Sequence, residues 1–232
     1  MVSNRRQDLI QLLVQDGKIS VKDLAQKYGV STETIRKDIA YLEQYGIAKK
    51  THGGAIYMND IREIPFYHMS IHRHEKYAIA KLATTLIQGP VVLMDGGSTT
   101  LTMAKLLSLR HQITIVTNSL SMGPILANAS DVKLVLTGGE VRQINQDQVG
   151  FLAVRTIREI SADACFIGTD SLSHPDGPSA YEMADVEIKQ AMLQASRMRY
   201  LVVDSSKWET SSPYQFAKWQ DFTAVITDSH IS

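Results

Sequence analysis

The chain has 232 residues, of which 44% are hydrophobic and 21% are charged, and its 24 basic residues balance 24 acidic residues. This composition excludes a disordered chain, a collagen and a coiled-coil rod, and the length predicts one or two domains. The absence of net charge argues against an indiscriminate polyanion binder. Because no apolar run approaches the roughly 18 residues of a membrane span and no secretory signal opens the chain, we expect a cytoplasmic protein without a membrane partner.

The charge is unevenly distributed along the chain. Residues 1–57 hold 9 Lys or Arg against 6 Asp or Glu, whereas the rest of the chain holds 15 against 18. Between Met58 and Arg73 the hydrophobic periodicity lapses around Pro65, which is typical of a linker. We therefore expect an N-terminal domain over residues 1–57, a linker over residues 58–73 and a second domain over residues 74–232.

Two short helices are predicted first. A helical repeat of leucines begins after Asn4 and ends at Gly17, where a left-handed cap would sit. Ser20 can cap the next helix, with Asp23 three residues later in the acidic position of a capping box. Gly29 ends this second helix after barely two turns.

A third helix follows at Ser31 and is expected to end at Gly46. Ile35, Ile39 and Leu42 form its apolar stripe. The opposite face carries hydroxyl and cationic side chains near the start of the helix, namely Thr32, Thr34, Arg36 and Lys37.

Two helices joined by a tight glycine turn, the second with hydroxyls and cations near its start, are typical of a DNA-reading helix-turn-helix. Extended stretches around Gly53-Gly54 predict a hairpin wing after the third helix. Long side chains would reach base edges and cations would contact phosphates. The candidate DNA-binding residues are Ser31, Thr32, Thr34, Arg36, Lys37, Lys49, Lys50 and His52. A protein-binding module or scaffold with solvated charges remains the alternative at this point.

The larger segment alternates a helical pattern, first seen over residues 76–87, with short apolar runs. These runs cover residues 91–94, 113–116, 132–136, 164–167, 200–203 and 224–226. Nearly continuous apolar runs are typical of strands covered on both faces. We therefore expect a mostly parallel α/β sheet with helices on its faces.

Glycine and short polar residues follow five of these strands. The carboxyl ends of parallel strands meet at one edge of a sheet, so these clusters are expected to form one crevice. Glycines permit close backbone approach, a helix N-terminus favours an anion, and a lysine balances phosphate charge. The candidate sugar phosphate residues are Asp95, Gly97, Ser98, Thr99, Thr100, Asn118, Gly138, Asp170, Lys189 and Lys207. Each cluster taken alone also has the composition of an ordinary turn.

Cofactor and metal motifs are weak. The loop after residue 94 lacks the Gly-Lys-Ser/Thr ending of a P-loop and the third glycine of a dinucleotide fingerprint, so we expect no nucleotide cofactor. His68, His72 and His74 cluster, but no carboxylate or cysteine completes a metal-ligand set. The one cysteine, Cys165, lies in an apolar run and is expected to be buried.

Motifs along nearly the whole chain resemble the DeoR family of bacterial transcription regulators. The N-terminal resemblance rests on Tyr28-Gly29-Val30-Ser31, Thr34-Ile35-Arg36-Lys37-Asp38 and His52-Gly53-Gly54-Ala55, and it implies that residues 31–37 open the recognition helix. The later clusters resemble the family's sensor domain, which is similar in fold to ribose-5-phosphate isomerases and coenzyme A transferases. The resemblance implies a repressor of a sugar-utilisation operon, controlled by a phosphorylated sugar or a related metabolite.

Two features depart from the family pattern. Asp185 stands where a glutamate is usual, and the chain ends at Ser232 where relatives usually continue through another helix and strand. The second departure bears on the packing of the sheet edge and on oligomerisation. We nevertheless expect a homo-oligomer, a dimer or tetramer, because operators commonly mirror a two-fold axis of the protein.

A rival hypothesis from another class is a sugar phosphate isomerase or hydrolase that carries a DNA-binding domain. Asp95 or Asp170 would then act as the general base. No nucleophile and base occur at a compelling spacing in the sequence. We therefore expect a regulator rather than an enzyme, with operator DNA and a phosphorylated sugar as partners.

Overall fold

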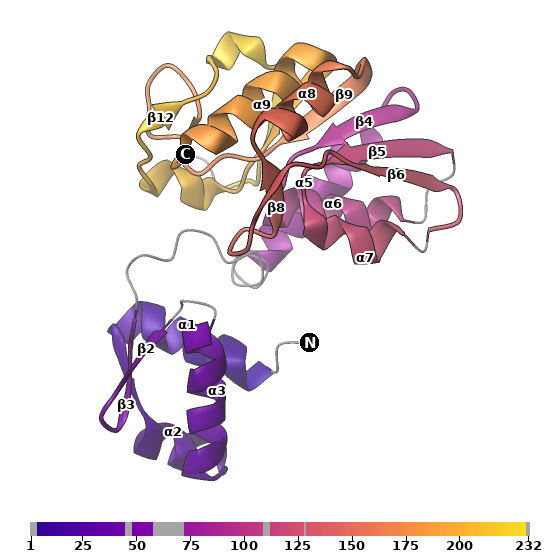
Figure 1. The fold of residues 1–232 in the computed structure, drawn as a ribbon. Helices are drawn as coiled ribbons and strands as arrows, with labels where there is room; N and C mark the ends of the chain where they lie inside the picture. Colours follow the sequence, from indigo (N-terminus) through magenta and orange to yellow (C-terminus); the bar gives the residue numbers. More distant parts are fainter. Residues whose placement is uncertain (1–3, 45–47, 58–71, 109–111, 128, 231–232) are drawn as a thin grey trace. The chain divides into compact units, whose positions relative to one another are not determined.

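The computed structural model of the protein describes residues 4–44, 48–57, 72–108, 112–127 and 129–230. The chain forms two compact units, Met1–Ile71 and His72–Ser232 (Figure 1). Most of the expected linker, with Met58, Pro65 and His68, lies outside the described residues, as do Gly46 and Ile47. Arg73, which we expected in the linker, already belongs to the first helix of the second unit.

The N-terminal unit consists of three helices and a small antiparallel sheet. Its elements are α1 (Asn4–Asp16), β1 (Lys18–Ser20), α2 (Val21–Tyr28), α3 (Thr32–Gln44), β2 (Ala48–Thr51) and β3 (Gly54–Tyr57). The strand order is β1-β3-β2, so the expected hairpin wing is present and a third strand, β1, pairs with it. The hydrophobic pattern of the sequence did not predict β1.

Local signals explain the ends of these helices. Gly17 and Gly29 adopt positive φ angles of 70° and 62°, which glycine adopts more readily than other residues. The hydroxyl of Ser20 accepts a hydrogen bond from the backbone N–H of Asp23 at 3.4 Å and so caps α2. Gly54 is required for another reason, because a Cβ at this position would lie 2.0 Å from the carbonyl oxygen of Ile19 in β1.

The second unit is built on a six-stranded sheet in which all neighbouring strands are parallel, in the order β13-β11-β9-β4-β5-β6. The strands are β4 (Val91–Met94), β5 (Ile113–Thr117), β6 (Val132–Leu136), β9 (Ala162–Ile167), β11 (Ser196–Val202) and β13 (Ala224–Ile226). All six apolar runs therefore form strands, and the expected parallel α/β architecture is confirmed.

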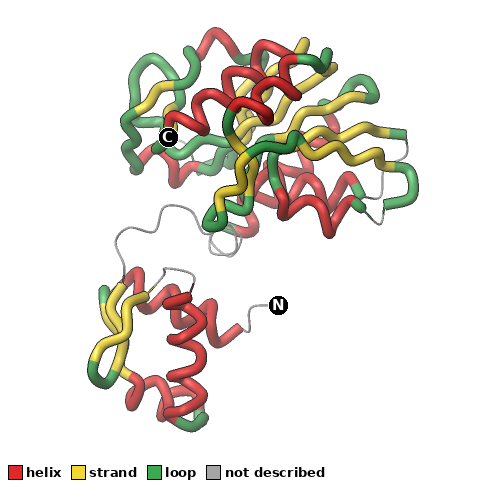
Figure 2. Tube along the Cα trace, in the orientation of Figure 1, coloured by secondary structure: helices red, strands yellow, loops and turns green. Residues whose placement is uncertain are grey.

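Helices cover both faces of this sheet (Figures 1 and 2). They are α5 (Arg73–Thr85), α6 (Ser98–Leu107), α7 (Gly123–Leu126), α8 (Phe151–Arg158) and α9 (Met183–Ala195). Leu93, Cys165 and Leu201 are fully buried in a core that also contains residues of α8 and α9. Burial raises the pKa of the Cys165 thiol to about 11, as befits a side chain that serves as a small hydrophobe.

Two small two-stranded sheets were not expected. One pairs β7 (Glu140–Arg142) with β8 (Asp147–Val149), and the other pairs β10 (Ser179–Ala180) with β12 (Tyr214–Gln215). An isolated bridge joins Ser119, just after β5, to Asp147. These additions bring distant polar segments to the carboxyl edge of the main sheet.

Candidate functional site

The first candidate site is the exposed surface formed by α3 and the wing. A hollow of about 440 Å³ lies between them and is lined by Val21, Glu33, Arg36, Lys37, Ile39, Ala40, Lys50, Thr51, Gly53 and Gly54. Three expected DNA-binding residues, Arg36, Lys37 and Lys50, thus meet around one depression. Lys49 and His52 are exposed on the wing, and Thr32 is exposed at the start of α3.

The start of α3 is organised by Ser31 and Thr34. The hydroxyl of Ser31 accepts a hydrogen bond from the backbone N–H of Thr34 at 3.1 Å, and the two hydroxyl oxygens lie 2.9 Å apart. Ser31 therefore acts as the N-cap of α3. The two hydroxyls bond to each other in the structure, whereas the sequence analysis offered both to DNA.

Two arginines near the N-terminus, Arg5 and Arg6, stabilise the fold. Asp38 is buried on α3, and its two carboxylate oxygens lie 2.6 Å from Nε of Arg5 and 2.7 Å from Nε of Arg6. The guanidinium of Arg6 also lies 4.0 Å from the centroid of the Tyr41 ring. Arg5 and Arg6 therefore attach α1 to α3, and part of the basic excess of this unit is neutralised internally.

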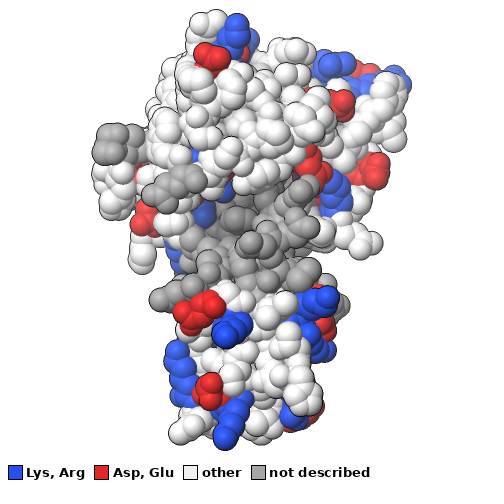
Figure 3. Space-filling view, turned by 90° about the vertical axis from the view of Figure 1, so that its left-hand side faces the viewer, with Lys and Arg blue, Asp and Glu red and all other residues white. Residues whose placement is uncertain are grey.

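A second ion pair fixes the wing to α3. Glu43 accepts a hydrogen bond from the backbone N–H of Lys50 at 2.9 Å, and its other oxygen lies 3.0 Å from Nζ of Lys50. These bonds to Lys50 lower the pKa of the Glu43 carboxyl below its ordinary value. In Figure 3, blue cations and red carboxylates are interspersed on the molecular surface rather than forming one basic field.

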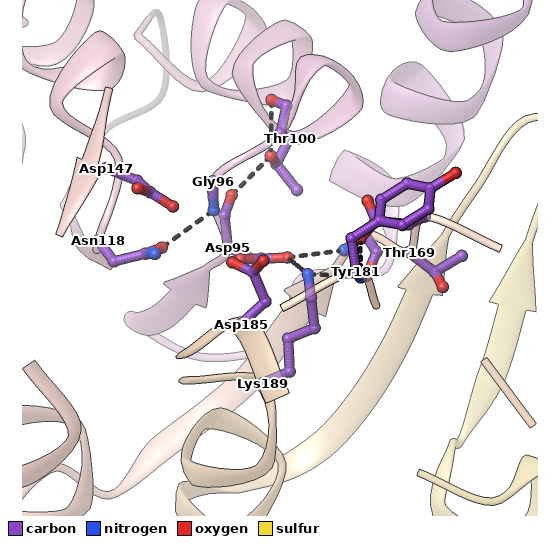
Figure 4. Close-up of polar contacts among 12 residues, drawn as sticks. Asp95, Gly96, Thr100, Asn118, Asp147, Thr169, Tyr181, Asp185 and Lys189 are labelled. Carbon is purple, nitrogen blue, oxygen red and sulfur yellow. Dashed lines mark hydrogen bonds and ion pairs between the residues drawn. The ribbon is translucent and has the colours of Figure 1, made fainter. Parts of the chain in front are cut away.

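The second candidate site lies at the carboxyl edge of the main sheet, where Asp95 follows β4. The buried ammonium of Lys189, on α9, forms an ion pair with the Asp95 carboxylate and donates to the carbonyl oxygen of Gly168 at 3.2 Å (Figure 4). Burial opposes this charge, but Asp95, Asp185 and Asp170 raise the pKa of Lys189 above its ordinary value. The lysine therefore stays protonated and is neutralised within the protein.

The loop after β4 is held by its neighbours. The hydroxyl of Thr100 donates to the carbonyl oxygens of Asp95 at 2.6 Å and of Gly97 at 3.0 Å. The amide oxygen of Asn118 accepts from the backbone N–H of Gly96 at 3.0 Å (Figure 4). Thr100, Asn118 and Lys189 are among the predicted ligand residues, and in the structure each of them also bonds to the loop.

The N-terminus of α6 opens directly after this loop. Its N-cap residue is Gly97, and no side chain caps the helix. The first helical turn includes Ser98, which is half-buried, and Thr99, which is buried. The first backbone N–H groups of a helix have no partner within it, so this terminus can donate to an anion.

Arg142 adds a charged cluster that the sequence analysis missed. Its guanidinium, on β7, bonds to Asp147 with Nε to oxygen at 2.9 Å, to Glu182 at 2.9 Å and to Asp185 at 3.2 Å. Burial opposes its charge, but the hydrogen bonds to Asp147 and Asp185 raise the pKa of Arg142. Arg142 thereby ties the β7–β8 hairpin to the start of α9. Asp185, the departure from the family pattern, is one of its partners.

A second group of cations lies at the carboxyl end of β11. Nζ of the buried Lys76, on α5, is 3.5 Å from Oδ2 of the buried Asp204. Burial works to raise the pKa of Asp204, but Ser206, Lys76 and Lys207 lower it overall. Lys207 is half-buried in the 3₁₀ turn Ser205–Glu209. Lys207 is one of the site residues expected from the sequence, whereas Lys76 is not.

The remaining predicted residues lie at the same edge. Asp170 is buried after β9 and accepts a hydrogen bond from the backbone N–H of Tyr181 at 2.9 Å. Its segment runs beside that of Lys207, whose carbonyl accepts from Leu172 at 2.9 Å. The backbone N–H of Gly138 donates to the Gln148 side chain at 3.1 Å. The structure therefore brings all five polar clusters to one edge of the sheet.

The described residues contain no group of three or more His, Cys, Asp or Glu side chains arranged for a metal ion. His72 precedes α5 and His74 lies in it, while His68 is outside the described part. Among the described helices, none is long and apolar enough to cross a membrane.

A winged helix-turn-helix followed in one chain by an α/β domain with polar clusters at one edge of its sheet defines a DNA-binding transcription regulator with a sensor domain. Residues 5–60 match the model of the DeoR-like helix-turn-helix domain, and residues 71–229 match that of the DeoR C-terminal sensor domain. The chain belongs to the DeoR family of transcription regulators.

Three curated relatives match over nearly the whole chain. "Putative aga operon transcriptional repressor" of Escherichia coli O157:H7 is 33% identical, with 99% of this chain and 87% of that protein covered. HTH-type transcriptional regulator GolR of Listeria innocua is 30% identical, with 98% and 91% covered. The lactose phosphotransferase system repressor of Lactococcus lactis is 29% identical, also with 98% and 91% covered.

Solved structures show a more distant likeness. The sorbitol operon regulator SorC of Klebsiella pneumoniae has a TM-score of 0.39 at 13% identity, with 88% of this chain and 90% of SorC covered. Ribose 5-phosphate isomerase A of Methanocaldococcus jannaschii has a TM-score of 0.42 at 17% identity, with 57% and 53% covered. At these scores the likeness adds nothing to the assignment of function.

Proposed function

We propose that this regulator represses a sugar-utilisation operon and that a phosphorylated sugar, bound at the carboxyl edge of the sensor sheet, controls its binding to operator DNA. The observation that carries the proposal is the α6 N-terminus, which has no side-chain cap and opens beside the Asp95 loop. The relative named as the lactose phosphotransferase system repressor supports the sugar class.

The geometry divides the proposed ligand site into two parts. The backbone N–H groups from Gly97 to Thr99 and the Ser98 hydroxyl would hold the phosphate, because a helix N-terminus favours an anion. Lys207, with Lys76 on the neighbouring helix, supplies positive charge at the same sheet edge. Asp95, Asp170, Asn118 and Gly138 would shape the part that receives the sugar hydroxyls.

We assign the sensor to binding rather than to catalysis. Both candidate general bases are engaged in the structure: Asp95 by Lys189 and by the N–H of Gly168 at 3.2 Å, and Asp170 by the N–H of Tyr181. A general base must reach the proton that it abstracts. Incubation of the purified protein with aldose and ketose phosphates is expected to give no turnover. Measured turnover would favour the isomerase or hydrolase hypothesis.

We further propose that the protein works in the cytoplasm as a dimer or tetramer. A single winged helix buries too little surface for strong specificity, and a two-fold protein matches an operator with two half-sites. Sedimentation at several concentrations is expected to show a species of two or more chains. A monomer at every concentration would contradict this assembly.

The ligand assignment is tested with thermal-shift and calorimetric titrations against a panel of sugar phosphates and the matching free sugars. The cognate phosphate is expected to raise the melting temperature, because a ligand that binds only the folded state stabilises it. Lys207→Ala is expected to weaken binding about tenfold, equivalent to about 1.4 kcal/mol, and to leave DNA binding intact. Arg155→Ala, on an exposed part of α8, is the matched control. Equal affinity for sugar and sugar phosphate would contradict the phosphate site.

A further inference from the structure

One carboxylate stands among the cations around the hollow between α3 and the wing. The charged residues that line this hollow are Glu33, Arg36, Lys37 and Lys50. On a surface that contacted only phosphates, Glu33 would weaken binding, because an ionised carboxylate is repelled by the DNA backbone. Glu33 therefore requires an explanation other than phosphate binding.

Glu33 lies in the part of the helix that reads bases in helix-turn-helix proteins. It lies in the first turn of α3, and its side chain is 64% exposed. In helix-turn-helix proteins, the N-terminal residues of the recognition helix are the ones that contact base edges in the major groove. The hydroxyl cap formed by Ser31 and Thr34 orders this same turn.

Glu33 also holds Arg36 beside it. Its Oε2 atom lies 3.6 Å from an Nη atom of Arg36, one turn further along the helix, and both side chains are nearly two-thirds exposed. Exposed pairs of this kind contribute little to stability, so the fold alone does not account for the pair. A carboxylate in the first turn of a helix interacts favourably with the helix dipole, although the effect is modest. The experiment must distinguish this purely structural role of Glu33 from a role in DNA reading.

The chemistry of the two side chains matches one base pair. Arginine donates two hydrogen bonds to O6 and N7 of guanine, and a carboxylate accepts from the N4 amino group of cytosine. We propose that Glu33 and Arg36 act together as the reader of a G·C pair or of two adjacent pairs, with Glu33 determining the preference for cytosine. Lys37 and Lys50 contact phosphates and add affinity for any sequence. The proposal rests on the DNA-binding function of the family and adds the specificity residue.

The test is a binding selection from a pool of randomised DNA duplexes, with the full-length chain and no effector. The wild-type motif is expected to contain a position with a strong preference for G·C. Glu33→Gln, which keeps the shape but carries donors as well as an acceptor, is expected to reduce the preference for cytosine there by about tenfold or more. The other positions of the motif are expected to stay unchanged.

Two further variants test whether the change in base preference is specific to the Glu33 carboxylate. Asp16→Asn removes an exposed carboxylate at the end of α1, outside the hollow, and is expected to select the wild-type motif. Glu33→Ala removes the acceptor altogether and is expected to relax the same position as Glu33→Gln. Thermal melting of each variant shows that it is folded, and Glu33→Gln carries the test should the alanine variant unfold.

The outcomes separate the inference from the function on which it rests. A Glu33→Gln protein that selects the wild-type motif with the same discrimination would overturn the reading role. A uniform change of affinity at all sequences would also overturn it, since that result reports charge alone. A wild-type protein that selects no motif would instead overturn operator binding itself, and the inference with it.

Discussion

The two units of the molecule use charged side chains in different ways. On the surface formed by α3 and the wing, Arg36 and Lys50 are 63% and 48% exposed, and their carboxylate partners are exposed as well. In the sensor, Lys189 and Asp95 are only 7% and 5% exposed. Exposed pairs are worth little to stability, whereas breaking a buried pair leaves an uncompensated charge. The exposed charges are therefore available for a partner, and the buried ones fix loops.

The largest effect is expected from Lys189→Met in the sensor. The variant leaves the Asp95 carboxylate buried without its cation, so the free energy of unfolding of this unit should fall by about 3–5 kcal/mol. Denaturant unfolding measures the loss. Glu159→Gln, which breaks the exposed Arg155–Glu159 pair, serves as the control and should change stability by less than about 0.5 kcal/mol. If both variants lowered the free energy of unfolding by similarly small amounts, the buried pair would not differ from an exposed pair in its effect on stability.

The reverse pattern is expected for Arg36→Ala combined with Lys37→Ala. These exposed residues should leave the melting temperature nearly unchanged, while operator affinity falls about 100-fold through one base contact and one phosphate contact. A gel shift with the selected duplex measures the affinity. Unchanged affinity would take α3 out of the reading role.

Asp38→Asn tests the one buried carboxylate of the N-terminal unit that pairs with arginines. Arg5 and Arg6 keep partial access to water, so the loss should be smaller than for Lys189→Met, about 2 kcal/mol. Because α1 would no longer be tied to α3, operator binding should weaken together with stability. Full stability of this variant would show that the two arginines do not attach α1.

A smaller, pH-dependent effect is expected from Asp204. Its folded-state pKa lies below the ordinary value of 3.8, so its ionised form stabilises the fold above that pH. The contribution is lost as the pH falls from 3.8 through the lower folded-state pKa. Unfolding measured between pH 3 and pH 6 should show this decline, and Asp204→Asn should reduce it. An identical pH profile in the variant would contradict the assignment.

Helices and strands were easier to predict from the sequence than the side chains that pair with each other, for physical reasons. Apolar runs long enough to show a pattern, such as residues 91–94 and 132–136, were recognised as strands, and glycines marked helix ends. The strands β1, β7 and β8 have three residues each, of which two are polar, so they show no apolar run. They form because tertiary contacts align them.

Residue type was also easier to predict than residue role. Lys189 was expected to meet a phosphate, but it is paired with Asp95, which lies 94 positions away in the chain. The sequence did not indicate the cluster around Arg142, because two of its partners, Glu182 and Asp185, follow it by some forty residues. Such pairings depend on the topology of the sheet, and a single sequence does not display them.

The most direct test of the account is the release of DNA by a ligand. The full-length protein, bound to its selected duplex, is titrated with the sugar phosphate that stabilises it and, separately, with the same sugar lacking the phosphate, and fluorescence anisotropy follows the duplex. The account predicts release by the phosphate at concentrations at least about tenfold lower than by the free sugar, because the α6 N-terminus and Lys207 require an anion. Release at equal concentrations, or a complex that no sugar phosphate affects, would contradict it.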